Sequence, residues 1–187
     1  MVPFFIIAGA PGAGKSTIAP ILAKTFDYDF FEGSALVSQE DIKAISRGTP
    51  MTESAYTQWM IDVVNTAYRF EKESSSKGIV GTCTALERKV RTIARNQSKK
   101  LSEEGSKLKL IFIWLEINKE ESLRRTKMRT GHYYNPEMTE WIFSLTETPH
   151  VEGNEKEENA YIVDASQKVE EVVADALQII SGVVQAS

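Results

Sequence analysis

Short apolar runs alternate with longer helical patterns along the whole chain. Five runs have the length and composition of buried strands, at residues 3–8, 28–31, 78–84, 108–115 and 160–163. Helical patterns lie between them, at residues 53–72, 86–104, 118–130 and 167–181. Because strands that alternate with helices form parallel βαβ units, this order predicts an α/β fold of three layers, with a parallel sheet of about five strands.

Two local signals predict further helices near the N-terminus. Residues 38–41 read Ser-Gln-Glu-Asp, the Ser-x-x-acid form of a capping box that opens a helix. Residues 17–19, Thr-Ile-Ala, open another helical pattern directly after a glycine-rich stretch. The expected order at the N-terminus is therefore strand, glycine-rich loop and helix.

Length and composition exclude several classes of protein. The 187 residues suit a single domain, and we expect 1–187 to form one unit. The net charge of −4 gives no broad basic field, so we expect no nucleic-acid partner. No run approaches the ~18 apolar residues of a membrane span, and Cys83 is the only cysteine. We therefore expect a cytoplasmic protein with no membrane partner and no disulfide framework.

A phosphate-binding motif occupies the predicted N-terminal loop. Residues 9–16 read Gly-Ala-Pro-Gly-Ala-Gly-Lys-Ser, a complete G-x-x-x-x-G-K-[ST] motif between a strand and a helix. In such a loop backbone amides bind phosphates, Lys15 bridges the β- and γ-phosphates of ATP, and Ser16 ligates Mg²⁺. The expected nucleotide contacts are Gly9, Ala10, Pro11, Gly12, Ala13, Gly14, Lys15, Ser16 and Thr17.

A cluster of cations precedes a glycine and two aromatic residues in segment 124–139. Arg124, Arg125, Lys127 and Arg129 fall within six residues, and Arg125 and Arg129 share one helix face. Kinases bring arginines over the migrating phosphoryl group, often on a mobile lid. We interpret 124–139 as a lid in which Arg125 and Arg129 act in catalysis and Arg125 also contacts the nucleotide. A solvated basic helix face is the alternative.

Polar residues also follow three predicted strands, at the edge of a parallel sheet where ligands bind. Glu32 could hold a Mg²⁺-bound water or orient an attacking hydroxyl, and a solvated loop acid explains it equally well. The hydroxyls of Thr82 and Thr84 could reach a metal through water or cap the next helix. Asp164 could contact the nucleotide near its base or cap a helix.

Together these residues resemble the gluconokinase family, small P-loop kinases related to shikimate kinase and built like nucleoside monophosphate kinases. The resemblance covers most of the chain, and its order and spacing include Glu32-Gly33, Gly48-Thr49-Pro50-Met51-Thr52, Trp59, Cys83-Thr84-Ala85-Leu86, Arg91, Arg129-Thr130-Gly131-His132-Tyr133, Pro149 and Ile162-Val163-Asp164. It implies ATP- and Mg²⁺-dependent phosphorylation of a gluconate-like sugar acid, D-gluconate to 6-phosphogluconate in the family. By analogy it also suggests a homodimer.

The departures from the family pattern gather where the sugar acid would bind. Ser34 stands in place of an expected aspartate, Val37 of a histidine, Tyr56 of an arginine and Glu87 of a lysine. The resemblance then implies acceptor contacts from Glu32, Ser34, Tyr56, Arg91 and His132. Three alternatives stay open: a shikimate- or nucleotide-type acceptor, a P-loop hydrolase, and a non-catalytic ATP-binding regulator, which Ser34 favours.

Overall fold

Five parallel strands form one sheet at the centre of the protein. The computed structural model describes residues 1–74, 76–129, 131, 134–154 and 156–186. Within these residues the strand order is β2-β3-β1-β4-β5, and every neighbouring pair is parallel. The strands are β1 (Val2–Ala8), β2 (Asp29–Glu32), β3 (Ile79–Thr82), β4 (Leu108–Glu116) and β5 (Ala160–Asp164).

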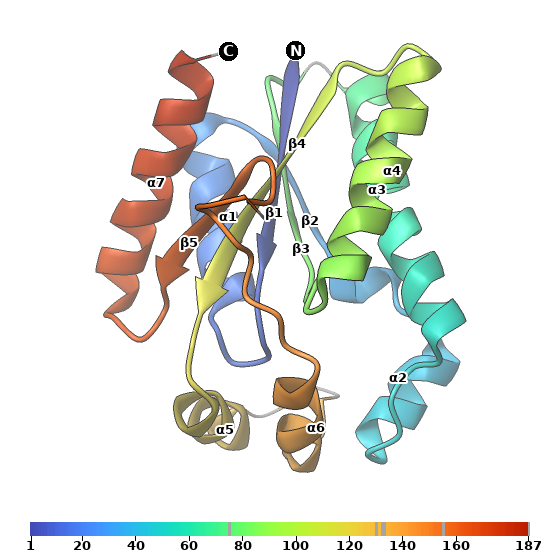
Figure 1. The fold of residues 1–187 in the computed structure, drawn as a ribbon, viewed down its shortest axis with the longest axis vertical. Helices are drawn as coiled ribbons and strands as arrows, with labels where there is room; N and C mark the ends of the chain where they lie inside the picture. The colour runs from blue at the N-terminus through green and yellow to red at the C-terminus, as the bar shows by residue number, and fades with distance from the viewer. Residues whose placement is uncertain (75, 130, 132–133, 155, 187) are drawn as a thin grey trace.

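Helices cover both faces of this sheet, which confirms the three-layer prediction. The α-helices are α1 (Lys15–Phe26), α2 (Gln39–Ser46), α3 (Glu53–Glu73), α4 (Arg88–Glu103), α5 (Lys119–Met128), α6 (Thr139–Ser144) and α7 (Val169–Gln185). Two short 3-10 turns are η1 (Gly33–Leu36) and η2 (Pro136–Met138). Helices α1 and α7 lie on one face and α3 and α4 on the other (Figure 1).

The central strands are apolar along their whole length because both of their faces are covered. Residues 4–8 of β1 are fully buried, and residues 111–115 of β4 are almost so. The sequence pattern located every one of these strands to within a few residues. The predicted strand at 78–84 differs most from the structure, because β3 ends at Thr82 and the next residues form the loop that leads to α4.

The carboxyl ends of the strands meet at one edge of the sheet. Helices α2, α5 and α6 lie beyond this edge, and both chain termini lie at the opposite edge (Figure 1). Loops that leave β1, β2 and β3 therefore converge at the place where open parallel sheets bind ligands. Among the described residues, no helix combines the length and apolar character needed to cross a bilayer.

Candidate functional site

The loop between β1 and α1 has a backbone that only glycine accommodates easily. Gly9, Gly12 and Gly14 all have positive φ, at 139°, 77° and 95°. A Cβ on Gly9 would lie 2.5 Å from the carbonyl oxygen of Leu115, and one on Gly12 would lie 2.9 Å from that of Ser122. The local backbone conformation therefore favours glycine at all three positions, and close approach of β4 to Gly9 and of α5 to Gly12 adds a steric reason at those two.

Lys15 folds back over the loop that it ends. Its ammonium group donates hydrogen bonds to the carbonyl oxygens of Gly9, at 2.9 Å, and Ala10, at 2.8 Å. Burial of the ammonium group lowers the pKa of Lys15 to about 8. Gly9 and Ala10, both expected nucleotide contacts, thus lie behind the loop surface and hold the lysine.

A cavity of about 820 Å³ opens at the carboxyl edge of the sheet. The P-loop forms one side of it, from Pro11 to Ile18. Seven further residues expected at the site from the sequence also reach it: Glu32, Ser34, Tyr56, Thr82, Thr84, Arg125 and Arg129. The structure therefore brings most of the candidate residues together, although they come from five separate segments of the chain.

The end of β2 is held by a set of short hydrogen bonds. The Thr82 hydroxyl donates to the Glu32 carboxylate at 2.6 Å and accepts from the amide of Gly33 at 3.2 Å. A Cβ on Gly33 would overlap the Thr82 carbonyl, and the Trp59 indole donates to the Gly33 carbonyl oxygen at 2.7 Å. Glu32 and Ser34 are half-buried and reach the cavity from this fixed turn.

Tyr56 adds an aromatic side to the same cavity. Its hydroxyl shares a hydrogen bond of 2.8 Å with the Thr84 hydroxyl, and its ring stacks on Trp59 with 5.5 Å between centroids. Burial raises the pKa of Tyr56, so the phenol stays neutral. At this position the cavity therefore has an uncharged aromatic ring where the family pattern has a cation.

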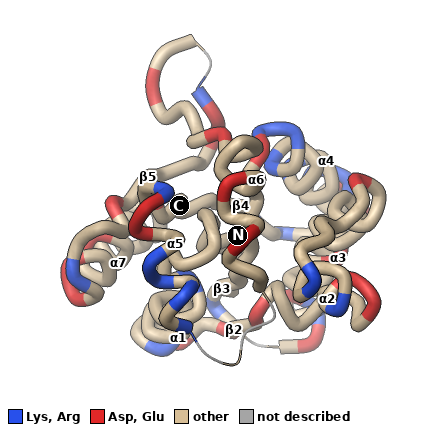
Figure 2. Tube along the Cα trace, turned by 90° about the horizontal axis from the view of Figure 1, so that it is seen from below, with Lys and Arg blue, Asp and Glu red and all other residues tan. Residues whose placement is uncertain are grey.

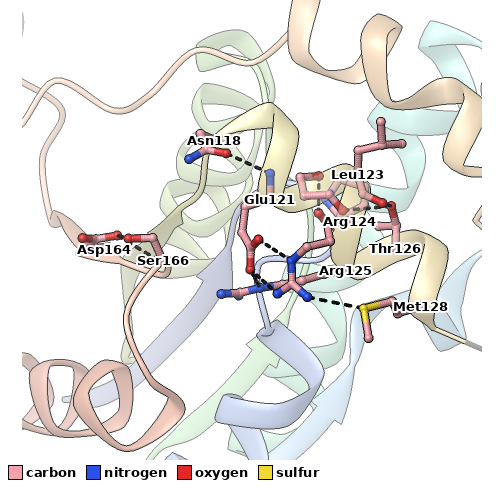
Figure 3. A network of polar contacts seen from close by, with 11 residues as sticks. Asn118, Glu121, Leu123, Arg124, Arg125, Thr126, Met128, Asp164 and Ser166 are labelled. Atoms are coloured by element: carbon pink, nitrogen blue, oxygen red, sulfur yellow. Dashed lines mark hydrogen bonds and ion pairs between the residues drawn. The ribbon is translucent and has the colours of Figure 1, made fainter.

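Helix α5 carries the arginines of the expected lid. Asn118 caps its first turn by accepting from the amide of Glu121 at 2.8 Å. The Glu121 carboxylate accepts from Arg124 at 2.6 Å and from Arg125 at 2.7 Å (Figure 3). These hydrogen bonds lower the pKa of Glu121 to about 2. Of these two arginines, only Arg125 lines the cavity. Figure 2 shows the Lys and Arg residues of α5 in blue.

Helix α5 is joined to the P-loop by a direct hydrogen bond. The Ser122 hydroxyl donates to the carbonyl oxygen of Pro11 at 2.8 Å. Arg129 follows the helix, is exposed and lines the cavity. His132, expected at the acceptor, lies outside the described residues.

Arg91 does not reach the cavity, which corrects its expected role in substrate binding. Its guanidinium group is fully buried and donates to both carboxylate oxygens of Glu157, at 2.9 and 2.6 Å. Its remaining nitrogen donates to the carbonyl oxygens of Ala85 and Leu86. Glu157 is only 4% exposed, because its loop folds onto α4. Arg91 therefore holds two loops together.

Asp164 also lies outside the cavity lining. Its carboxylate accepts hydrogen bonds from the amide and hydroxyl of Ser166, at 2.8 and 2.6 Å (Figure 3). This closes a turn before α7, whose N-cap residue is Lys168. The neighbouring Ala165 and Gln167 line the cavity instead. The residues next to Asp164, and not Asp164 itself, therefore border the cavity.

One whole side of the cavity was not predicted from the sequence. Helix α6 and the turn before it contribute four apolar residues with helical spacing, Met138, Trp141, Ile142 and Leu145. Their i, i+3, i+4, i+7 pattern is the signal that could have revealed this short helix. The ion pairs of Lys89 with Glu53 and Glu87 at the cavity were missed too. The pair with Glu53 joins α3 to α4, which lie far apart in the sequence, and the pair with Glu87 lies at the start of α4.

Comparisons with known proteins agree with this geometry. The chain matches the shikimate kinase family over residues 11–181. It is 32% identical to a probable gluconokinase of Schizosaccharomyces pombe, over 78% of this chain and 72% of that protein. Crystal structures of a sugar kinase from Janibacter and a gluconokinase from Sinorhizobium meliloti share its fold. Their TM-scores are 0.79 and 0.76, each at 24% identity. They cover 97% and 99% of this chain, and the matches span 95% and 94% of theirs.

The family match and the fold lead to the same conclusion. A match over most of the chain and a five-stranded parallel sheet both agree with a P-loop kinase. Kinases of this kind use a nucleotide as phosphoryl donor. The chain belongs to the gluconokinase family, itself matches the shikimate kinase family, and is a phosphotransferase.

Proposed function

We propose that the protein transfers the γ-phosphoryl group of ATP to a hydroxyl of a gluconate-like sugar acid. One observation carries this proposal: a single cavity is lined by the P-loop, the Glu32 carboxylate, Arg125 and Arg129. Phosphoryl transfer needs positioning and neutralisation of charge more than covalent help from the protein, and this set of groups meets both needs. Gluconokinases among the relatives support the sugar-acid class of acceptor.

The P-loop side of the cavity is the proposed ATP site. Gly14 is the N-cap of α1, so the amides of the first turn and the positive end of the helix dipole lie beside the phosphates. The Lys15 ammonium would exchange its carbonyl partners for β- and γ-phosphate oxygens. Ala165 and Gln167 are placed to border the base.

The same side offers what Mg²⁺ would need in such a site. Among the described residues no three His, Cys, Asp or Glu side chains cluster as a metal site. Ser16 and Glu32 both line the cavity, and Mg²⁺ in nucleotide sites is typically held by few protein ligands, with phosphates and water completing its shell. Ser16 would hold the ion directly and Glu32 through a water. The bound ion would neutralise charge on the transferring group.

Segment 124–139 is the proposed lid over this site. The Ser122 to Pro11 hydrogen bond anchors the start of α5 on the P-loop, and Arg125 and Arg129 already line the cavity. Arg125 shares the Glu121 carboxylate with Arg124, so its guanidinium is held by an i, i+4 ion pair. Closure would bring both cavity arginines over the γ-phosphate and exclude water.

Glu32 is the proposed residue that orients the acceptor hydroxyl. We expect Glu32→Gln to lower kcat by roughly 10²- to 10⁴-fold, the range for loss of a general base, with ATP affinity little changed. Gln is of nearly equal size and retains an acceptor for the Thr82 hydroxyl, so the turn should persist. Steady-state kinetics measures the first effect, and calorimetric titration with ATP measures the second.

The control for this variant is Glu40→Gln, which removes an exposed carboxylate from the first turn of α2. It should leave kcat within about twofold, since surface changes of this kind rarely exceed ±0.5 kcal/mol. Equal kcat values for wild type and Glu32→Gln would remove Glu32 from the mechanism.

ATP affinity should weaken as the pH rises through the pKa of Lys15. That pKa is lowered to about 8 by burial, so the ammonium group is mostly charged at pH 7 and mostly neutral at pH 9. If only the charged form binds well, ATP affinity falls by about tenfold between these pH values. Calorimetry at pH 8 in two buffers with different ionisation enthalpies should show proton uptake on binding. A constant affinity without proton uptake would contradict this role of Lys15.

One assay distinguishes the proposed kinase from a non-catalytic protein that binds ATP as a regulator. ADP release is followed with and without a panel of sugar acids, shikimate and nucleosides. An acceptor-dependent rate supports a kinase and ranks the acceptors. ATP binding without any acceptor-dependent rate supports the regulator.

A further inference from the structure

The side of the cavity opposite the P-loop is largely apolar. Helices α2, α3, α4 and α6, the turn η2 and the loop before α3 contribute to it, through residues that include Ile45, Met51, Trp59, Val90, Met138 and Trp141. In Figure 1, α2 and α6 lie beyond the carboxyl edge of the sheet, and α3 and α4 run beside the sheet. We call these six residues the apolar wall. Trp141 is 42% exposed, so it has surface left to bury against a ligand.

The charges beside the apolar wall are already paired, with an excess of acid. The Lys89 ammonium lies 3.1 Å from a Glu53 carboxylate oxygen and 3.0 Å from one of Glu87. Among the cavity-lining residues that the structure describes, Lys89 is the only cation that belongs neither to the P-loop nor to the proposed lid, segment 124–139. Arg91, one of the expected acceptor contacts, is buried on Glu157. A carboxylate here would meet two carboxylates and one shared ammonium.

These two features select the same kind of acceptor. An uncharged apolar group gains from burial on the apolar wall, whereas a free carboxylate would be repelled and would lose its hydration. Resting on the proposed phosphoryl transfer, and narrowing its acceptor from the free sugar acid to an uncharged derivative, we infer that the preferred acceptor is a polyhydroxy compound whose end away from the reacting hydroxyl is uncharged and apolar. An aryl amide of a sugar acid has this form, and free gluconate does not.

Binding measurements test this inference without requiring turnover. The full chain, loaded with a non-hydrolysable ATP analogue and Mg²⁺, is titrated calorimetrically with gluconate and with N-phenylgluconamide. Burial of one phenyl ring predicts a Kd for the amide that is roughly ten- to a hundredfold lower than that for gluconate. Equal affinities, tighter binding of gluconate, or binding of neither compound would overturn the inference.

Three variants test whether the named residues cause the preference for the amide over gluconate. Trp141→Ala should remove most of the difference in Kd between the amide and gluconate, because it removes part of the apolar wall. The matched control is Tyr161→Ala, which removes an aromatic residue of similar exposure from β5, outside the cavity lining. It should keep the full preference. Glu53→Gln combined with Glu87→Gln frees Lys89 and should tighten gluconate binding while leaving the amide unchanged.

The binding and activity measurements can fail independently, so they distinguish an error in the inferred acceptor preference from an error in the proposed phosphoryl transfer. If the amide binds more tightly but neither compound yields ADP in a coupled assay, the proposed function fails and the inference about the cavity stands. If gluconate is phosphorylated and also binds at least as tightly as the amide, the proposed function stands and the inference fails.

Discussion

Lys15→Ala is expected to lower kcat/KM for phosphoryl transfer by at least about 10³-fold. The Lys15 ammonium lies within the P-loop, 2.9 and 2.8 Å from two loop carbonyl oxygens, and is placed to reach the β- and γ-phosphates. Its loss removes a charge that a water molecule cannot replace. The fold should persist, because burial already makes the charged ammonium group unfavourable and its removal therefore costs little stability.

Two measurements separate loss of function from loss of fold in this variant. Thermal unfolding should stay within a few degrees of wild type, while coupled-assay kinetics and ATP titration show the defect. The control is Lys24→Ala, which removes an exposed lysine from the last turn of the same helix. Unchanged ATP affinity together with unchanged turnover in Lys15→Ala would contradict the assignment of the P-loop.

Arg91→Ala is expected to destabilise the fold by about 3–5 kcal/mol, because it leaves the Glu157 carboxylate buried without its main partner. Glu157 is 4% exposed and accepts two hydrogen bonds from Arg91 and one from Arg95. The guanidinium group also packs 5.4 Å from the Trp114 ring centroid. A loss of this size is a large fraction of the stability of an ordinary domain. Denaturant unfolding measures it.

The double variant Arg91→Met with Glu157→Leu distinguishes the buried charge from lost packing. Removing both charges should recover most of the stability, since apolar replacements of a buried ion pair are often neutral. If the double variant is as unstable as Arg91→Ala, packing rather than the unpaired carboxylate explains the loss.

The same ion pair makes stability depend on pH. Burial alone would raise the pKa of Glu157, but Arg91 and Arg95 hold this pKa below its usual value. A lowered folded-state pKa adds stability above the unfolded pKa, and that stability is lost as the pH falls. Wild type should therefore lose more stability between pH 6 and pH 3 than the apolar double variant.

The strands, the P-loop and the layer order could be predicted because each rests on short-range patterns. Residues 4–8 are continuously apolar since β1 is covered on both faces, and the P-loop glycines follow from local backbone geometry. Such features need no knowledge of distant contacts. The same holds for the N-cap at Ser38, whose hydroxyl accepts from the amide of Asp41.

The partners of charged residues could not be predicted, because they depend on how distant segments fold together. Arg91 pairs with Glu157, 66 positions away, and so an expected substrate cation is part of the core. Lys89 pairs with Glu53, 36 positions away, for the same reason, whereas its other partner, Glu87, is a near neighbour in the sequence. The family resemblance indicated which positions would contact the acceptor, but it did not reveal how the charged residues among them are paired.

The most direct test of the proposed activity is to identify the phosphorylated product. The protein is incubated with ATP, Mg²⁺ and each sugar acid or its aryl amide, and the mixtures are analysed by mass spectrometry and ³¹P NMR. We expect an acceptor that gains one phosphoryl group as a phosphomonoester while ADP forms in equal amount, with no product from Lys15→Ala. ADP and inorganic phosphate alone, with every acceptor unchanged, would contradict the proposed transfer.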